Sequence, residues 1–224
     1  NRQEIIETVY EGQGEPWQTS PKKGSGFYNE KLAKQYTEYD MDLANQYLDE
    51  AGFAERDSEG WRLGPDGKRI EFVVITRKDQ TEVNAAMKQI IPAWREAGIY
   101  ASIKSLTKPE WKKLKGNNQA ECMITGSTGG LANVVLNPSM HLPTDSSTAW
   151  AGTWYNWYDN VKKGKQEEPV EWVKQGLALY EKVLTTLDEE ERGRLMQQIL
   201  ELSAENFPII GIALPESGYS IVSN

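Results

Sequence analysis

The residues best suited to chemistry lie between Gly126 and Trp157, where aromatic and small polar side chains are concentrated in one segment. No regular apolar period runs through this segment, and residues 150–158 hold three tryptophans and two tyrosines. Indole rings offer large flat faces and lose little side-chain entropy on binding. The cluster therefore predicts a surface that stacks on a flat ligand group. The alternative is that the rings fill the side of a helical layer, because aromatic residues usually pack in cores.

Small polar residues and glycines in the same segment supply hydrogen-bonding groups. Glycines leave backbone amides accessible, and hydroxyl and amide side chains can orient a ligand. We expect this set to bind a small polar or amphipathic solute without transforming it. For Trp157 we favour a structural role, in which the ring anchors the loop to a helix that begins near Pro169. The candidate ligand-binding residues are Trp150, Trp154, Gly126, Ser127, Thr128, Asn133 and Asn137.

Neither catalysis nor a metal centre is favoured by the residue types present. One histidine, His141, and one cysteine, Cys122, are too few for a His/Cys zinc site or an internal disulfide. The chain contains neither Gly-x-Ser-x-Gly nor Gly-x-x-x-x-Gly-Lys, the motifs of a nucleophile elbow and a phosphate loop. One enzyme alternative remains, a carbohydrate-active domain that uses Asp145 and Asp159 as its carboxylate pair. We predict no catalytic residue, no metal and no cofactor, and we expect His141 to pack or to lie on the surface.

Composition limits the classes of partner. The chain has 224 residues, of which 38% are hydrophobic, so it can bury a core. Its formal net charge of −8 disfavours nucleic acid, because phosphate binding needs a dense basic face. No apolar stretch approaches the roughly 20 residues that cross a bilayer, and no signal peptide is evident. The chain begins in a helical pattern and ends in a strand-like run, so we expect it to be a piece of a longer protein, cut at both ends.

The elements that must position these residues follow an α/β pattern. Strands over 70–75 and 99–106 flank a helix over 81–97, and this spacing predicts a parallel crossover. A third strand over 120–125 leads directly into the glycine-rich residues. We predict one lobe over 1–224 with a mixed sheet of about five strands, helices on both faces and a long irregular aromatic-rich loop over 126–168. Further helices are expected over 2–10, 40–52, 108–114, 171–186 and 188–207, and further strands over 208–214 and 219–222. We predict that Asp188 caps the last of these helices. We also predict that the helix over 40–52 buries an apolar stripe of Leu43, Ala44, Tyr47, Leu48 and Ala51.

Several short motifs together resemble one known family. They are Asn1-Arg-Gln-Glu-Ile-Ile with Gly12-Gln-Gly-Glu-Pro16, Tyr39-Asp40 with Ala44-x-x-Tyr-Leu-Asp-Glu-Ala-Gly52, Pro65-Asp-Gly-Lys, and Trp157-Tyr-Asp with Glu167-Glu-Pro169. In this order they resemble the second lobe of the family 5 solute-binding proteins of ABC importers. That group includes binders of dipeptides, oligopeptides, nickel and oligosaccharides. The resemblance spans nearly all of the chain.

The resemblance implies the second lobe of a type II periplasmic-binding-protein fold, which closes on its ligand against a first lobe that is missing here. It implies a periplasmic or extracellular protein, free or lipid-anchored, that delivers solute to an ABC permease. It adds Trp17 as a candidate site residue, because the Gly12–Pro16 loop lies near the interlobe side in relatives.

The resemblance also bears on the ligand. In the peptide binders, a Gly-Trp-x-x-Asp-like segment follows the matching strand, and its Asp pairs with the peptide amine. This sequence has Gly126-Ser127-Thr128-Gly129-Gly130 instead, and a buried ammonium without a counter-charge costs several kcal/mol. We expect an oligopeptide or similar small solute, with an oligosaccharide as the alternative.

Overall fold

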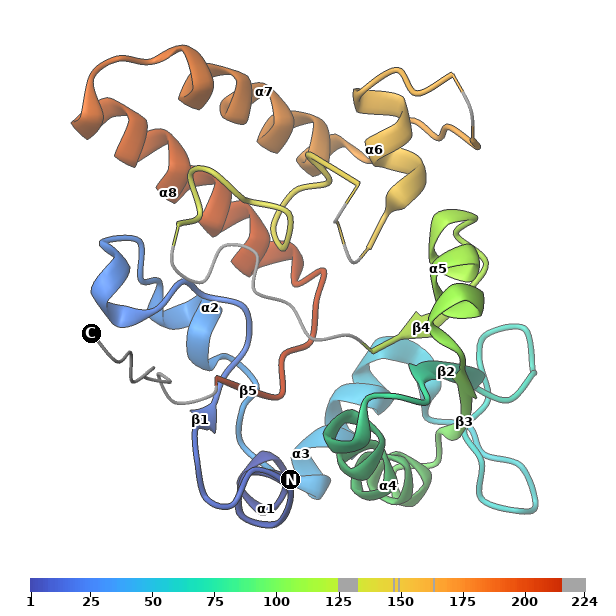
Figure 1. Ribbon diagram of the computed structural model, residues 1–224. Helices are drawn as coiled ribbons and strands as arrows, with labels where there is room; N and C mark the ends of the chain where they lie inside the picture. Colours follow the sequence, from blue (N-terminus) through green and yellow to red (C-terminus); the bar gives the residue numbers. More distant parts are fainter. Residues whose placement is uncertain (125–132, 147, 149, 163, 215–224) are drawn as a thin grey trace.

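The computed structural model describes residues 1–124, 133–146, 148, 150–162 and 164–214. In this part of the chain, helices and short strands alternate and then give way to a layer of helices (Figure 1). The helices are α1 (Arg2–Val9), α2 (Glu30–Lys34), α3 (Met41–Leu48), α4 (Thr81–Glu96), α5 (Lys108–Gly116), α6 (Gly152–Tyr158), α7 (Glu171–Thr185) and α8 (Glu189–Asn206), with a 3₁₀ turn at Lys23–Ser25 and a π-helical turn at Asp49–Phe53. The strands are β1 (Glu15–Pro16), β2 (Glu71–Arg77), β3 (Tyr100–Leu106), β4 (Cys122–Met123) and β5 (Ala213–Leu214).

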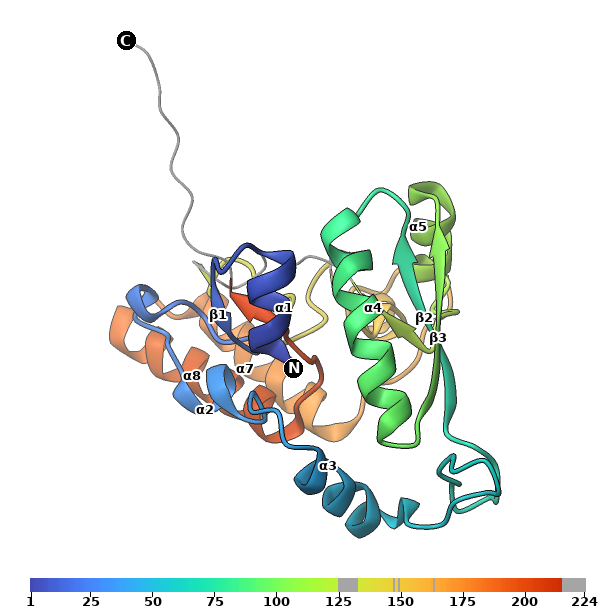
Figure 2. The same ribbon diagram turned by 90° about the horizontal axis from the view of Figure 1, so that it is seen from below.

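A three-stranded parallel sheet with the order β3-β2-β4 forms one part of the molecule. Successive side chains on a strand point to opposite faces, so Val74 of β2 packs against Met87 and Ile91 of α4, whereas Ile75 packs against Trp111 of α5. Figure 2 shows the two helices beside these strands. The parallel crossover and the helices on both faces of the sheet are confirmed.

A second, two-stranded sheet joins the two ends of the described chain. Strand β1 pairs antiparallel with β5, and Glu15 lies opposite Leu214. Gly211, just before β5, lies so close to Gln18 that an added Cβ would stand 2.3 Å from the Gln18 carbonyl oxygen. The α/β class is therefore confirmed, but the five described strands divide between two small sheets. The strand expected over 208–214 is shorter, and residues 219–222 lie outside the described residues.

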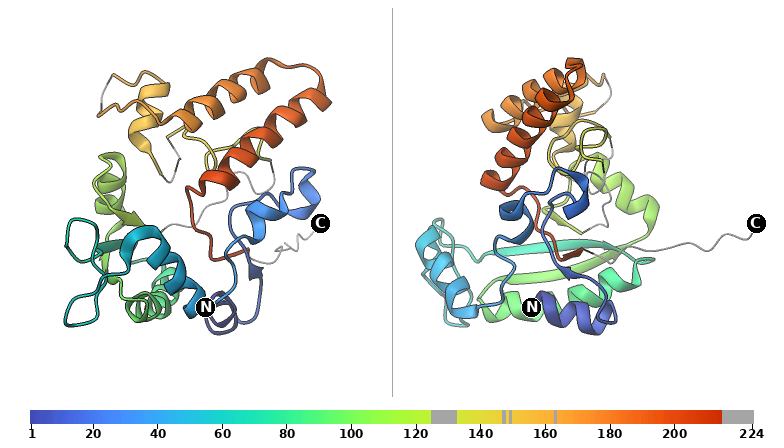
Figure 3. Two further views of the ribbon diagram at one scale, coloured as in Figure 1. Left: turned by 180° about the vertical axis from the view of Figure 1, so that it is seen from behind. Right: turned by 90° about the vertical axis from the view of Figure 1, so that its left-hand side faces the viewer.

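Helices α7 and α8 pair as a hairpin that contains the largest apolar cluster, including Leu177, Met196 and Ile199. Figure 3 shows this hairpin on one side of the molecule and strands β2 and β3 on the other. Helix α8 begins after Asp188, whose carboxylate accepts a hydrogen bond of 2.7 Å from the Glu191 amide. An oxygen at this position satisfies an amide that has no partner within the helix, and the predicted cap is confirmed.

Two local expectations differ from the structure. The expected apolar stripe of α3 is not buried, and Tyr47 remains 47% exposed. The loop expected to be irregular over 126–168 contains the helix α6, which carries Trp154 and Trp157. Aromatic residues have only moderate helix propensity, so this short helix was not evident from the pattern. Among the described helices, none is both long and apolar enough to cross a bilayer.

Candidate functional site

The first part of the candidate site is the carboxyl edge of the parallel sheet. The Ile124 amide donates to the Ile75 carbonyl at 3.1 Å. The pairing of β4 with β2 therefore continues as far as Ile124. In open parallel sheets, ligands bind outside the carboxyl ends of the strands. The candidates Gly126, Ser127 and Thr128 follow Ile124 closely in the sequence and lie outside the described residues.

Asn84 organises the turn between β2 and α4 at the same edge. Its side-chain nitrogen donates to the carbonyls of Arg77 and Gln80, both at 2.7 Å. Its side-chain oxygen accepts from the Thr76 hydroxyl at 2.6 Å and from the Ser105 hydroxyl at 3.2 Å. One amide therefore fixes two strand ends and the start of a helix. Sequence reasoning missed Asn84, because a lone Asn in a helix carries no signal for distant contacts.

Trp111 lies beside this edge, on α5, and is only 7% exposed. The guanidinium of Arg77 lies 6.0 Å and the ammonium of Lys115 lies 5.7 Å from its ring centroid, within the range of cation–π attraction. Arg77 also pairs with Asp79 at 2.5 Å, and this hydrogen bond lowers the pKa of the Asp79 carboxyl. The buried indole nitrogen of Trp111 has no hydrogen-bond partner in the part of the chain described.

The second part of the candidate site is the aromatic cluster on the helical layer. Trp150 stacks on Trp172 of α7 with ring centroids 5.7 Å apart and planes 12° apart. Trp154 meets Trp150 edge to face at 5.9 Å and 79°. The Trp150 indole nitrogen donates to the Met140 carbonyl at 3.2 Å. Trp172 was missed, since its position in a regular amphipathic helix suggested packing alone.

Both expected roles of the cluster have a basis in this geometry. Trp150 and Trp154 are half-buried and pack against the apolar cluster of α7 and α8. Part of their surface therefore fills the side of a helical layer, as the alternative required. The remaining part is exposed. Trp157, expected to serve as an anchor, is 39% exposed.

The remaining candidates have contacts within the chain. The Asn133 side-chain oxygen accepts from the Leu136 amide at 3.2 Å, and that of Asn137 accepts from the Ser139 hydroxyl at 2.6 Å. These bonds shape the turns of the loop. Trp17 is only 1% exposed, and its indole nitrogen donates to a backbone carbonyl at 2.9 Å. The Trp17 ring is thus part of the core of this lobe. This differs from the expectation that Trp17 is a site residue near the interlobe side.

Two groups considered for catalysis lie near one tyrosine: burial raises the pKa of the Tyr155 hydroxyl, and the Asp159 and Asp145 carboxylates raise it further. Asp159 accepts a hydrogen bond of 3.0 Å from the Tyr155 hydroxyl. The pKa of the Lys115 ammonium is lowered by burial, and the Asp145 carboxylate acts against that shift. His141 is fully buried, and burial lowers its pKa to about 4. Within the described ranges, no three His, Cys, Asp or Glu side chains are grouped so that they could hold a metal.

Comparison with known proteins identifies the family. A model of the bacterial extracellular solute-binding proteins, family 5, matches residues 1–149. The chain belongs to this family. The resemblance found in the sequence is thereby confirmed, and the proteins of family 5 are extracellular or periplasmic binding proteins.

Comparison with individual relatives gives the degree of similarity. It is 26% identical to an oligopeptide-binding protein OppA with a TM-score of 0.82, and the match covers 95% of this chain and 35% of the other. The periplasmic binding protein MelB of Agrobacterium fabrum C58, in complex with stachyose, shares the fold with a TM-score of 0.75 at 18% identity, over 95% of this chain and 31% of MelB. A periplasmic alpha-galactoside-binding protein of Rhizobium meliloti (strain 1021) is 20% identical over 84% of this chain and 27% of its own length. The family 5 chain thus spans about a third or less of these relatives.

Proposed function

We propose that this chain is one ligand-binding lobe of the substrate-binding component of an ABC importer. The complete protein captures an oligopeptide or a similar small solute between this lobe and a first lobe supplied by the rest of its length. The observation that carries the proposal is the pairing of β4 with β2 at the carboxyl edge of a parallel sheet, which residues 126–128 follow closely in the sequence. Membership of family 5 and the likeness to OppA support it.

The lobe binds its solute with two kinds of group. Ser127, Thr128 and the amide of Gly126, which follow β4 in the sequence, supply hydrogen bonds to the solute, and the exposed parts of Trp150 and Trp154 supply apolar contact. Asn133 and Asn137 hold the intervening loop in shape, and their remaining donors orient the ligand. Trp17 is buried in this lobe. We therefore assign it a structural role in the packing of the lobe rather than contact with the solute. The receptor releases its ligand unchanged, because it works as a carrier.

An oligosaccharide is the second candidate ligand. Residues 126–130 contain no carboxylate that could pair with a peptide amine, and a cluster of indole rings suits the apolar faces of sugars. The alpha-galactoside-binding relative and the stachyose complex of MelB are consistent with that class. We propose that the complete protein works in the periplasm or at the cell surface, free or lipid-anchored, and that an ABC permease is its partner.

A thermal-shift screen of the complete protein against peptides and oligosaccharides tests the proposal. Binding to the folded state raises the midpoint temperature in proportion to the logarithm of ligand concentration. We expect one ligand class to raise it and the double substitution Ser127→Ala, Thr128→Ala to weaken that effect. Ser58→Ala, which removes an exposed hydroxyl elsewhere, is the matched control. Stabilisation by neither class, or chemical turnover of the ligand, would refute the receptor function.

A further inference from the structure

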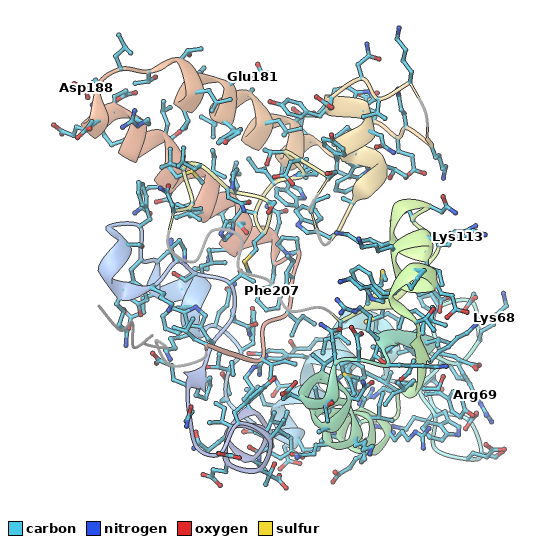
Figure 4. All side chains as sticks on the ribbon, in the orientation of Figure 1. Lys68, Arg69, Lys113, Glu181, Asp188 and Phe207 are labelled. Atoms are coloured by element: carbon cyan, nitrogen blue, oxygen red, sulfur yellow. The ribbon has the colours of Figure 1, made fainter. Side chains whose placement is uncertain are left out.

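Charge is segregated along this lobe. Residues 104–116 contain five lysines and one glutamate, a net charge of +4, in a chain whose formal charge is −8. Figure 4 shows Lys113 on the same side of the molecule as Lys68 and Arg69, whereas Glu181 and Asp188 lie at the opposite end, on the α7–α8 hairpin. The lysine-rich stretch and the acidic α7–α8 hairpin therefore lie in different parts of the lobe. Lys68 and Arg69 are themselves paired with Asp66, Asp57 and Glu59.

Four of these lysines form what we call the lysine face: Lys104 on β3 and Lys108, Lys112 and Lys113 on α5. All four are exposed, and none forms a salt bridge with an acidic residue in the described part of the chain. The opposite side of α5 is buried through Trp111, so the helix presents its lysines outward.

The one glutamate within residues 104–116 caps the start of α5. Glu110 accepts hydrogen bonds from the Thr107 hydroxyl at 2.6 Å and the Thr107 amide at 2.8 Å. These bonds lower the pKa of the Glu110 carboxyl, and Lys78 and Lys104 lower it further. Lys104 thus acts on the first turn of α5, next to which strand β3 ends at Leu106. Glu110 thus caps α5, and it forms no salt bridge with any of the four lysines of the lysine face in the described part of the chain.

We propose that the lysine face binds anionic phospholipid headgroups and holds this lobe against a membrane, with the acidic α7–α8 end pointing away. A protein partner would need apolar or aromatic anchors at the centre of its interface, and the large exposed hydrophobic residue closest in sequence is Ile103, at 38% exposure. Attraction to headgroups needs only basic charge near the surface. Lys104 on the edge strand also hinders strand addition, but that role does not explain the three lysines of α5.

Vesicle co-sedimentation of the complete protein tests this proposal. The probes are vesicles of phosphatidylcholine with and without a fraction of phosphatidylglycerol. Each lysine near an anionic surface strengthens binding by roughly fivefold, so we expect Lys104→Gln, Lys108→Gln, Lys112→Gln, Lys113→Gln to weaken binding to the anionic vesicles by at least about tenfold. Binding of the unaltered protein should fall as salt is added, because salt screens exposed charges.

The matched control removes the same charge elsewhere. Lys31, Lys88, Lys162 and Lys182 are exposed, and their joint replacement by Gln should leave vesicle binding within about twofold of the unaltered protein. An equal loss in the control would show that net charge alone matters and would overturn the proposal. Equal binding to vesicles with and without phosphatidylglycerol would also overturn it and would leave an acidic protein as the partner. Both four-lysine variants should keep solute binding, so this test is independent of the receptor function.

Discussion

His141 gives the protein a dependence on pH that can be traced to one side chain. It is the single histidine of the chain and is fully buried in the described structure. Its Nδ1 lies 3.1 Å from the Ser203 hydroxyl, and its Nε2 has no hydrogen-bond partner among the described residues. A protonated ring would carry a charge out of water with one N–H unsatisfied, which is why burial lowers its pKa from 6.5 to about 4.

The magnitude follows from this difference. Between pH 6.5 and about 4 the unfolded chain binds a proton at His141 and the folded chain does not, so the contribution to stability is complete above pH 6.5 and is lost as the pH falls. A difference of about 2.5 in pKa corresponds to a loss of about 3 kcal/mol in the free energy of unfolding by pH 4, of which about 2 kcal/mol is lost by pH 5.

Urea unfolding of the protein and of His141→Asn at pH 7 and pH 5 measures this loss. Asn keeps a polar group beside the Ser203 hydroxyl and does not titrate, so the comparison removes the contribution of the carboxyl groups. We expect the unaltered protein to lose about 2 kcal/mol more than the variant between the two pH values. Equal losses in the two proteins would show that His141 does not carry a lowered pKa, and the reasoning from burial would be wrong.

Three substitutions test the packing of the lobe by urea unfolding. Arg62 is fully buried and donates to the Ala97 carbonyl at 2.8 Å, so Arg62→Ala should cost about 3–5 kcal/mol. Arg69 is more exposed, so Arg69→Ala should cost much less. Similar costs for the two substitutions would contradict this account. Gly98 has a φ of +88°, and an added Cβ would lie 2.4 Å from Arg56 Nη1. Gly98→Ala should therefore cost about 1–3 kcal/mol in the free energy of unfolding. A neutral result would show that the turn can relax. Asp188→Ala should cost about 1 kcal/mol and Asp188→Asn much less, whereas equal costs would mean that the cap contributes through its charge.

The crossover and the helix cap were predictable because their causes are local. Strand β2, helix α4 and strand β3 follow each other within the span from Glu71 to Leu106, and alternation and helical period identify each element. The cap at Asp188 needs only a carboxylate three residues before an amide. Such features depend on neighbouring residues and so are legible in a single sequence.

The remaining features depend on contacts between distant residues. The pairing of Glu15 with Leu214 joins opposite ends of the described chain, and no local pattern distinguishes one mixed sheet from two small ones. The stacking of Trp150 on Trp172 also depends on how a loop meets a helix. The amphipathic pattern of α3 correctly predicted a helix, but it could not say how far neighbouring elements would cover Tyr47.

A ligand-bound crystal structure of the complete protein, with a solute identified by the thermal-shift screen, tests the central claim most directly. The account predicts that the solute lies at the carboxyl edge of the β3-β2-β4 sheet and contacts Ser127 or Thr128. It also predicts contact with the exposed part of Trp150 or Trp154. A solute bound away from this edge, with residues 126–128 out of contact, would contradict the account.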